Sequence, residues 1–417
     1  MSQRSLTQIS TGRMKSAILR HARSKNPAFF WGHPGVAKSA VVAQTAAGLG
    51  YHLEDIRLSQ ISSIDLRGLP TKAGTEENPN VVWAMPDFLK RAKQKWDEEG
   101  IATIFFFDEL NSAGSEVMKA AYQFIFDRRI GPFELGPKDF VLAAGNFSTD
   151  GAGVSEMPVP LLNRFTHYHV TVNAKDWCEW AIKSNKHPWV VSFIDANPEH
   201  LHCFSGGAAD AVKRIQSEQG KAFNTPRTWE FLSNDLHAMQ NTEFSTYEEV
   251  SVSKEQEESG FTIDAFNEDD LDILASTTIG AGIGQDFIAF IKKGKDLPKA
   301  QDVVDGKAES NEMLRKNISG MYMLTNSICY ILRNEKETMA TCENAEQKKA
   351  LKSTHESHVK NFINFAYKNF TPDMFTAATV EKMTRQLRII APMGSDESKL
   401  VLAAFQKIAQ IDRADMA

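Results

Sequence analysis

The sequence has few cysteines, no long apolar run and no apolar leader. Its 417 residues hold four cysteines, far apart and without a Cys-x-x-Cys pair: Cys178, Cys203, Cys329 and Cys342. This spacing argues against a zinc site and against a disulfide framework. No apolar run approaches the roughly 18 to 20 residues that cross a bilayer, and Met1 to Gln8 lacks the apolar core of a signal peptide. We therefore expect an intracellular, cytoplasmic protein with no membrane contact.

The chain also lacks a basic excess and internal repeats. Lys and Arg number 47 against 53 Asp and Glu, which gives a net charge of −6. Proteins that bind nucleic acid non-specifically usually have the opposite sign, so nucleic acid is not an expected partner, although a local basic patch remains open. Hydrophobic residues make up 42% of the chain, enough to build real cores. At about 150 residues per domain, the length corresponds to two or three compact units.

Short apolar runs alternate with helical patterns over roughly the first 172 residues. The predicted strands, each bounded by turn-forming or polar residues, are 28–31, 53–58, 103–107, 140–144 and 167–170. Helical patterns between them cover 38–49, 87–97 and 115–126. This alternation is typical of β-α-β units, so we predict an α/β fold with a parallel five-stranded sheet.

Beyond residue 175 the strand-like runs nearly disappear and helical patterns replace them. We therefore predict an α/β core over 1–175, a largely helical domain over 176–300 and a C-terminal helical region of unknown role over 301–417. Residues 243–258 carry six Glu and one Lys with few apolar residues, so we expect an exposed, solvated loop there.

A glycine-rich turn connects the first of these apolar runs to the first helical pattern. Its residues are Gly32, His33, Pro34, Gly35, Val36, Ala37, Lys38 and Ser39. A strand that ends in such a turn aims backbone N–H groups at a helix N-terminus, where the helix dipole also favours an anion. Lys38 would then reach the β- and γ-phosphates of a nucleotide, and the Ser39 hydroxyl would contact Mg²⁺. The alternative is a chance turn between a strand and a helix.

One position departs from the general phosphate-loop pattern G-x-x-x-x-G-K-[ST]. Ala37 stands where the pattern has its last glycine. Because alanine tolerates a helical backbone and adds only a methyl group, we expect Ala37 to begin the helix without loss of the mechanism.

Two adjacent carboxylates follow the apolar run 103–107. Such a run is typical of a central strand buried on both faces, and its carboxyl end lies at the same sheet edge as the phosphate loop. Asp108 could hold the metal, directly or through water, while Glu109 polarises the water that attacks the γ-phosphate. The alternative is a solvated Asp-Glu turn.

Further polar side chains follow the next apolar runs. Asn146 ends the run 140–145 and could hydrogen-bond the γ-phosphate or orient the water; it could also satisfy its own turn backbone. Arg164, a lone arginine among apolar neighbours, could stabilise transition-state charge from an adjacent subunit, or could form an ordinary structural ion pair. Arg128 and Arg129 are weaker candidates for the same task.

A helix start is predicted at Thr225-Pro226, with Pro226 at the first helical position. Arg227 then places a cation near the positive end of the helix dipole, which is unfavourable by roughly 0.3–1 kcal/mol unless an anion lies nearby. A nucleotide phosphate would supply that anion, and a surface salt bridge would also relieve the mismatch.

Taken together and in this order, these motifs resemble the AAA+ ATPases, and among them the MoxR-like branch of the helix-2-insert group. Gly32–Ser39 resembles the Walker A motif of that group, in which alanine before the lysine also occurs, and Phe107–Asn111 resembles its Walker B motif. Asn146 matches sensor 1, Arg164 the arginine finger and Arg227 sensor 2. The segments 57–68 and 81–83 resemble an insertion that faces the central pore in relatives, 131–138 resembles the pre-sensor hairpin, and 287–298 resembles a helical tail.

The resemblance implies an Mg²⁺- and ATP-dependent enzyme that forms a ring, expected to be a hexamer, with nucleotide between subunits and 176–300 as a helical lid. It also implies a protein client and a partner with a von Willebrand factor A domain. No D-x-S-x-S motif occurs in the chain, so that domain would belong to another polypeptide. The competing hypotheses are a nucleic-acid motor and a nucleotide-gated scaffold, the latter disfavoured because Glu109 has no use in binding alone.

Overall fold

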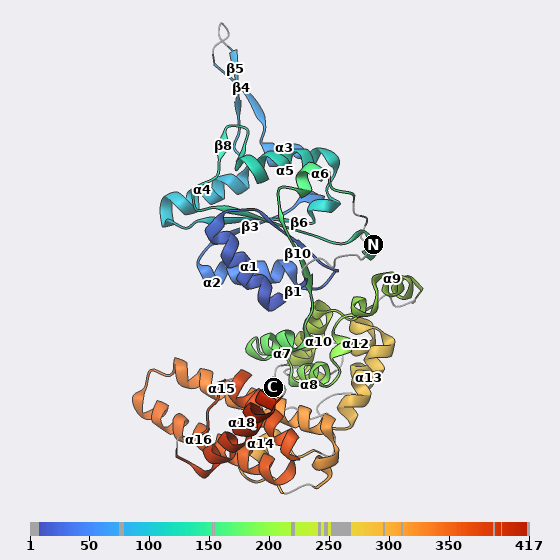
Figure 1. Cartoon of the computed structure of the whole chain (residues 1–417), viewed down its shortest axis with the longest axis vertical. Coiled ribbons are helices and arrows are strands. Elements are labelled where there is room, and N and C mark those ends of the chain that lie inside the picture. Colours follow the sequence, from blue (N-terminus) through green and yellow to red (C-terminus); the bar gives the residue numbers. More distant parts are fainter. Residues whose placement is uncertain are drawn as a thin grey trace. The chain divides into compact units, whose positions relative to one another are not determined.

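The computed structural model describes residues 8–74, 79–151, 153, 155–217, 222–240, 243–245, 249–251, 268–294, 297–309, 312–386, 388–392 and 394–414 (Figure 1). The chain divides into two compact units. Unit 1 comprises residues 1–176, 202–219 and 225–227, and unit 2 comprises residues 177–201, 220–224 and 228–417. All predicted site residues belong to unit 1.

Unit 1 is built on a parallel sheet of six strands, which confirms the predicted α/β fold class. The strands are β1 (Gln8–Ser10), β2 (Ala28–Trp31), β3 (His52–Arg57), β6 (Thr103–Asp108), β9 (Phe140–Gly145) and β10 (Thr166–Thr171). Their order across the sheet is β1-β10-β2-β9-β6-β3. The five predicted strands are present, but the predicted strand number was wrong. The sixth strand, β1, has three residues and pairs with β10, and a segment so short carries no periodicity that a sequence pattern could reveal.

The two faces of the sheet are covered by different helices because successive strand residues point to opposite sides. On one face Phe29, Phe105 and Phe107 pack in a core with α4 (Asp87–Glu99), α5 (Ser115–Asp127) and α6 (Val159–Leu162). On the other, Phe30 and Phe106 pack against α1 (Thr11–Ser24) and α2 (Lys38–Leu49). Figure 1 shows α1 and α2 below the sheet and α4, α5 and α6 above it. The central strands are therefore buried on both faces, as their continuous apolar runs predict.

An insertion separates β3 from α4, where the sequence resembles the helix-2 insert. It contains η1 (Leu58–Gln60), the short helix α3 (Ser63–Arg67) and an antiparallel hairpin of β4 (Pro70–Gly74) and β5 (Pro79–Trp83). The hairpin projects away from the sheet in Figure 1 and exposes Val81 and Val82. A second, smaller hairpin of β7 (Arg129–Ile130) and β8 (Phe133–Glu134) lies between α5 and β9, in the segment that resembles the pre-sensor hairpin.

Short helical elements complete unit 1. These are η2 (Leu110–Ser112), η3 (Ser148–Asp150), η5 (Cys203–Gly206) and α9 (Ala208–Ser217), together with the first two residues of α10 (Pro226–Gln240). Helix α10 begins at Pro226, the position that the sequence predicts.

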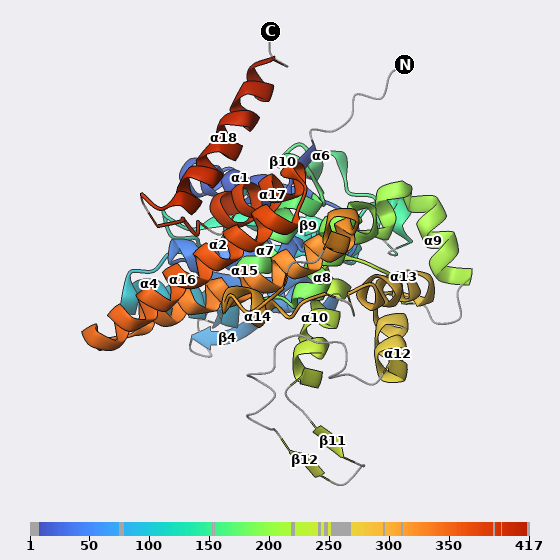
Figure 2. The same ribbon diagram turned by 90° about the horizontal axis from the view of Figure 1, so that it is seen from below.

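Unit 2 is mostly helical. Its described helices are α7 (Ala174–Lys183), α8 (Pro188–Ala196), η4 (Pro198–Leu201), α12 (Glu268–Ile279), α13 (Ala281–Lys292), α14 (Ala300–Val304), η7 (Glu312–Lys316), α15 (Ile318–Thr341), α16 (Ala345–Asn369), α17 (Pro372–Thr376), the π-helix η8 (Ala377–Gln386) and α18 (Asp396–Ala414), together with residues 228–240 of α10. The first residues of α7 are assigned to unit 1. A single apolar cluster joins α14 to α18, and the long helices α15 and α16 run side by side (Figure 2). The buried Lys382 of η8 pairs with Asp195 of α8. Among the described residues, no helix has the length and apolar composition needed to cross a bilayer.

The predicted solvated loop at 243–258 is only partly a loop. Its first residues form two short antiparallel strands, β11 (Glu243–Ser245) and β12 (Glu249–Ser251), which Figure 2 shows as a separate hairpin. These six residues are therefore paired in a short hairpin, and the solvation of the segment stays a prediction. Residues 246–248 and 252–258 lie outside the described residues.

Candidate functional site

The glycine-rich turn lies between β2 and α2, at the carboxyl end of a central strand. Gly35 has φ +76°, and a Cβ built there would lie 2.6 Å from the Cβ of Thr225, so only glycine fits beneath that threonine. Ala37 also adopts the left-handed region, with φ 68° and ψ 27°. The expectation that Ala37 begins a right-handed helix was wrong: the helix begins at Lys38, and Ala37 keeps the backbone conformation for which the general pattern uses glycine.

The turn presents a set of backbone N–H groups without acceptors. Among the described residues, the amides of Gly35, Val36 and Ala37 donate no hydrogen bond, and neither do the first-turn amides of Lys38 and Ser39. Unpaired amides that surround a helix N-terminus form a concave nest with a positive potential. The loop can therefore accept an anion with several oxygen atoms.

Lys38 is buried and donates hydrogen bonds back to the loop. Its Nζ lies 2.7 Å from the Gly32 carbonyl oxygen, 3.3 Å from that of His33 and 2.9 Å from Asn146 Oδ1. Burial lowers the pKa of Lys38 to about 8, and the carboxylates of Asp108 and Asp150 partly offset this effect. A phosphate placed in the loop would give this ammonium group the counter-charge that it lacks.

Ser39 connects the loop to the acidic pair. Its Oγ donates to Asp108 Oδ2 at 2.5 Å, and the other carboxylate oxygen of Asp108 accepts from the Glu109 amide at 2.9 Å. Glu109 has φ 55°, an unfavourable conformation for a residue with a side chain, and its carboxylate accepts a short hydrogen bond from Ser59. A strained acidic residue held by one hydroxyl is consistent with a chemical role, because such strain concentrates at functional sites.

Asn146 meets the loop from the neighbouring strand β9. Its side-chain oxygen accepts a hydrogen bond from Lys38 Nζ, so the Asn146 side chain does more than satisfy the backbone of its own turn. The backbone oxygen of Asn146 accepts from Asn111 Nδ2 at 2.7 Å. Gly145 leaves room for this bond, because a Cβ there would overlap Asn111 Oδ1. Asn111 thereby fixes the end of β9 relative to the acidic strand β6.

A histidine cluster supports the opposite side of the loop. His33 contacts the fully buried Asp150 through Nδ1 at 2.7 Å and stacks on Phe204 with ring centroids 5.2 Å apart. Nε2 of His202 lies 3.1 Å from the Pro34 carbonyl oxygen, and burial lowers the pKa of His202 to about 4. His202 is therefore neutral at physiological pH and donates to the loop as a structural brace.

Arg227 is exposed at the start of α10, close enough to Lys38 for its charge to lower the pKa of that lysine. No described residue forms an ion pair with Arg227, so the surface salt bridge considered as the alternative is absent from the described part of the chain. Two cations that face the same loop repel one another unless an anion lies between them.

Arg164 lies apart from this group, at the end of α6. Its guanidinium carbon is 3.6 Å from the centroid of the Tyr122 ring and 4.2 Å from that of Phe126. No carboxylate among the described residues pairs with Arg164, so the structural ion pair is not observed there. Arg128 donates to the carbonyl oxygens of Gly136 and Asp139, which ties it to the segment between the small hairpin and β9.

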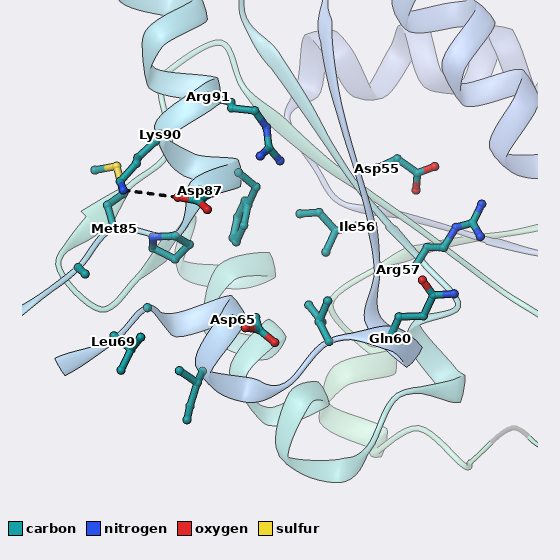
Figure 3. Close-up of a pocket in the computed structure, with 16 residues that line it drawn as sticks. Asp55, Ile56, Arg57, Gln60, Asp65, Leu69, Met85, Asp87, Lys90 and Arg91 are labelled. Carbon is teal, nitrogen blue, oxygen red and sulfur yellow. Dashed lines mark hydrogen bonds and ion pairs between the residues drawn. The ribbon is translucent and has the colours of Figure 1, made fainter.

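A separate pocket of about 610 Å³ lies beside the edge strand β3, between α3 and the start of α4 (Figure 3). Its lining includes Asp55, Arg57 and the ion pair of Asp87 with Lys90, whose atoms are 3.4 Å apart. Burial, and then the charge of Asp108, raise the pKa of Asp55. None of the predicted site residues lines this pocket, and the structure assigns it no chemistry.

The oxygen donors of the site fit magnesium. Ser39 Oγ and Asp108 Oδ2 lie side by side, and a hydroxyl with one carboxylate is typical of Mg²⁺ sites that are completed by water and phosphate. In the described part of the chain, no group of three or more His, Cys, Asp or Glu side chains could hold a metal by itself. Any ion here would therefore need the phosphates of a bound nucleotide.

Sequence reasoning gave no role to Ser59, Asn111, Asp150 or His202, although they hold Glu109, Asn146 and the loop. Asn111 stands in the segment that resembles the Walker B motif, and Ser59 in the segment that resembles the insertion. No local sequence signal shows that their side chains hold other site residues. Asp150 and His202 follow the loop by more than a hundred residues, and only the folded chain brings them to it.

Comparisons with known proteins give distant similarities. No family model matches the chain. Midasin of Giardia intestinalis is 28% identical over 185 residues, which are 42% of this chain and only 3% of that protein. A candidate ATPase of Cytophaga hutchinsonii is 13% identical with a TM-score of 0.30, over 95% of this chain and 89% of that one. The RuvB Holliday junction branch migration motor of Thermotoga maritima is 15% identical with a TM-score of 0.31, over 75% and 76%.

Proposed function

We propose that the chain is an Mg²⁺-dependent ATPase of the AAA+ type, related to the MoxR-like branch. The observation that carries this proposal is the hydrogen-bonded group of Lys38, Asn146, Ser39 and Asp108 around a loop with unpaired amides. Two side chains from the start of α2 and one from the carboxyl end of each of two strands converge on one anion-binding nest. A chance turn between a strand and a helix has no reason to collect a buried lysine, an amide and a hydroxyl-carboxylate pair at the same point.

Each residue has a role that its position allows. The loop amides and Lys38 bind the β- and γ-phosphates, and Ser39 and Asp108 hold the metal directly or through water. Bound Mg²⁺ supplies positive charge to the phosphate oxygens. Glu109 accepts a proton from the attacking water while Asn146 orients that water or the γ-phosphate. The bond between the γ-phosphorus and the bridging oxygen breaks, and ADP leaves with that oxygen.

The two remaining arginines act from different sides. The charge of Arg227 acts on Lys38, so Arg227 would contact the phosphates within the same subunit. The Arg164 guanidinium lies over two rings of α5 and, among the described residues, forms no hydrogen bond with the loop, so we assign it to the nucleotide of a neighbouring subunit, which requires that subunits associate. A ring of six subunits is the assembly that the family resemblance suggests. A protein client remodelled by the ring, and a separate partner with a von Willebrand factor A domain, are further parts of this proposal that rest on that resemblance.

Nucleotide binding and hydrolysis can be tested separately. Lys38→Ala should abolish binding of ATP, because it removes the cation that faces the phosphates. Glu109→Gln should bind Mg²⁺-ATP like the unmodified protein but release phosphate at least a hundredfold more slowly, since general-base catalysis contributes about 10²–10⁴-fold. Binding is measured with a fluorescent ATP analogue and turnover by phosphate release.

The outcomes also separate the competing hypotheses. Equal phosphate release by Glu109→Gln and the unmodified protein would remove Glu109 from the mechanism. Tight binding without any phosphate release by the unmodified chain, at every protein concentration, would indicate a nucleotide-gated scaffold. Turnover that rises on addition of DNA, with salt-sensitive DNA binding, would indicate a nucleic-acid motor.

A further inference from the structure

The surroundings of Arg164 are unusual for an arginine that is partly buried. Its guanidinium donates no hydrogen bond to any described residue, and Nη1 is buried without a partner. A buried donor that has lost its water and gained no acceptor is destabilising, and such groups are rare in folded proteins. Its guanidinium instead lies over two aromatic rings.

Two rings of one helix provide these contacts. Tyr122 and Phe126 are four residues apart on α5, so they lie on the same face of that helix. The guanidinium carbon lies within 4.2 Å of both ring centroids, close enough for a strong cation–π interaction with each. The rings therefore fix where the charged group lies without pairing its charge.

Phe126 itself is in an unfavourable position. Its side chain is 60% exposed, whereas the adjacent Phe124 and Ile125 are almost completely buried. An exposed phenylalanine at the end of a helix contributes little to the core of unit 1. Its contact with the Arg164 guanidinium is an interaction that core packing does not explain.

Stacking against a ring occupies the flat face of a guanidinium and leaves its N–H groups, which point outward in the plane, without acceptors. An arginine held in this way keeps the fork of donors that binds phosphate oxygens. A carboxylate partner would have held Arg164 equally firmly but would have neutralised the charge that an anion needs.

We propose that Tyr122 and Phe126 are positioning residues for Arg164. They hold its guanidinium against one face of α5 as an unpaired charged group for the γ-phosphate of an adjacent subunit, so that hydrolysis in one subunit depends on two rings of the next. This inference rests on the proposed ATPase function and on the role of Arg164 in trans.

Substitutions that remove the rings but keep apolar volume test the proposal. Phe126→Leu and Tyr122→Leu should each lower kcat about tenfold, which corresponds to about 1.4 kcal/mol, while the affinity for the fluorescent ATP analogue and the assembly state stay unchanged. Phe126→Tyr and Tyr122→Phe keep the rings and should retain normal kcat. Phe231→Leu is the matched control, because Phe231 is 51% exposed in unit 2 and has no cation–π contact with Arg164.

Mixing subunits distinguishes this positioning role from a general loss of structure. Phe126→Leu subunits keep Glu109 but present Arg164 poorly, whereas Glu109→Gln subunits cannot hydrolyse ATP but present Arg164 well. A mixture of the two should regain turnover above the sum of the separate proteins. A mixture of Arg164→Ala with Glu109→Gln should do the same.

The two mixtures fail for different reasons. No gain with Arg164→Ala at saturating protein would refute the role of Arg164 in trans, and the positioning role with it. A gain with Arg164→Ala but none with Phe126→Leu would overturn the positioning role alone, since the phenylalanine would then act on its own subunit. Normal kcat in both leucine variants would overturn it as well.

Discussion

Ala37→Gly should stabilise unit 1, although glycine normally weakens the start of a helix. Ala37 has φ 68°, and the left-handed region costs an L-residue with a Cβ roughly 1–2 kcal/mol. Glycine removes that cost but gives the unfolded chain more freedom, which offsets about 0.4–1 kcal/mol. The net expectation is a gain of about 0.5–1 kcal/mol in the free energy of unfolding.

A second alanine of the same helix is the matched control. Ala43 is exposed in the interior of α2, where the backbone is right-handed, so Ala43→Gly should lower the free energy of unfolding by about 0.8–1 kcal/mol. Denaturant unfolding gives the stability of each variant. Hydrogen–deuterium exchange of peptides from residues 28–49 shows whether the change lies at the loop.

The two substitutions must have opposite signs for the reasoning to hold. If Ala37→Gly destabilises the chain as much as Ala43→Gly does, the left-handed conformation of Ala37 carries no strain. The Ala37→Gly variant should also bind the ATP analogue at least as well as the unmodified protein, because the nest of amides keeps its backbone geometry.

Other consequences can be measured independently. Because burial lowers the pKa of Lys38 to about 8, the affinity for ATP should fall as pH rises above 8 and the ammonium group loses its proton. Arginine stays charged, so the residual ATP affinity of Lys38→Arg should not change up to pH 10. Between pH 8 and 10.5 the lysine keeps its proton in the unfolded chain but has lost it in the folded chain. As pH rises through that window, the free energy of unfolding of the unmodified protein should therefore increase relative to that of a Lys38→Met variant. Equal pH slopes for the two proteins would contradict the assigned pKa. Gly145→Ala should destabilise unit 1 by about 1–3 kcal/mol, because its Cβ would overlap Asn111 and lie 2.9 Å from the Phe29 ring, whereas Gly48→Ala, on the open face of α2, should stabilise it by about 0.8–1 kcal/mol. Thermal unfolding of both variants measures the change in melting temperature. Equal changes would show that the end of β9 has space for a methyl group.

The sequence by itself determined five of the six strands of the sheet in unit 1 and the helices between them. Continuous apolar runs such as 103–107 can be satisfied only by burial on both faces, which predicts a parallel sheet covered by helices. It also placed a glycine-rich turn and an acidic pair after two of those strands. In a parallel sheet the carboxyl ends lie at one edge, so the meeting of Lys38 with Asn146, and of Ser39 with Asp108, follows from the pattern once the strands are adjacent.

The tertiary structure decided what no local pattern encodes. Strand β1 is too short to be recognised and forms because β10 offers it a free edge. Ala37 accepts a left-handed backbone because the loop geometry on both sides requires it, against the preference of its own side chain. Asp150 and His202 brace the loop across more than a hundred residues of chain, and Arg164 finds its two rings on a helix that ends 37 residues earlier. Propensity and periodicity act over a few residues, whereas these contacts depend on which surfaces the core brings together.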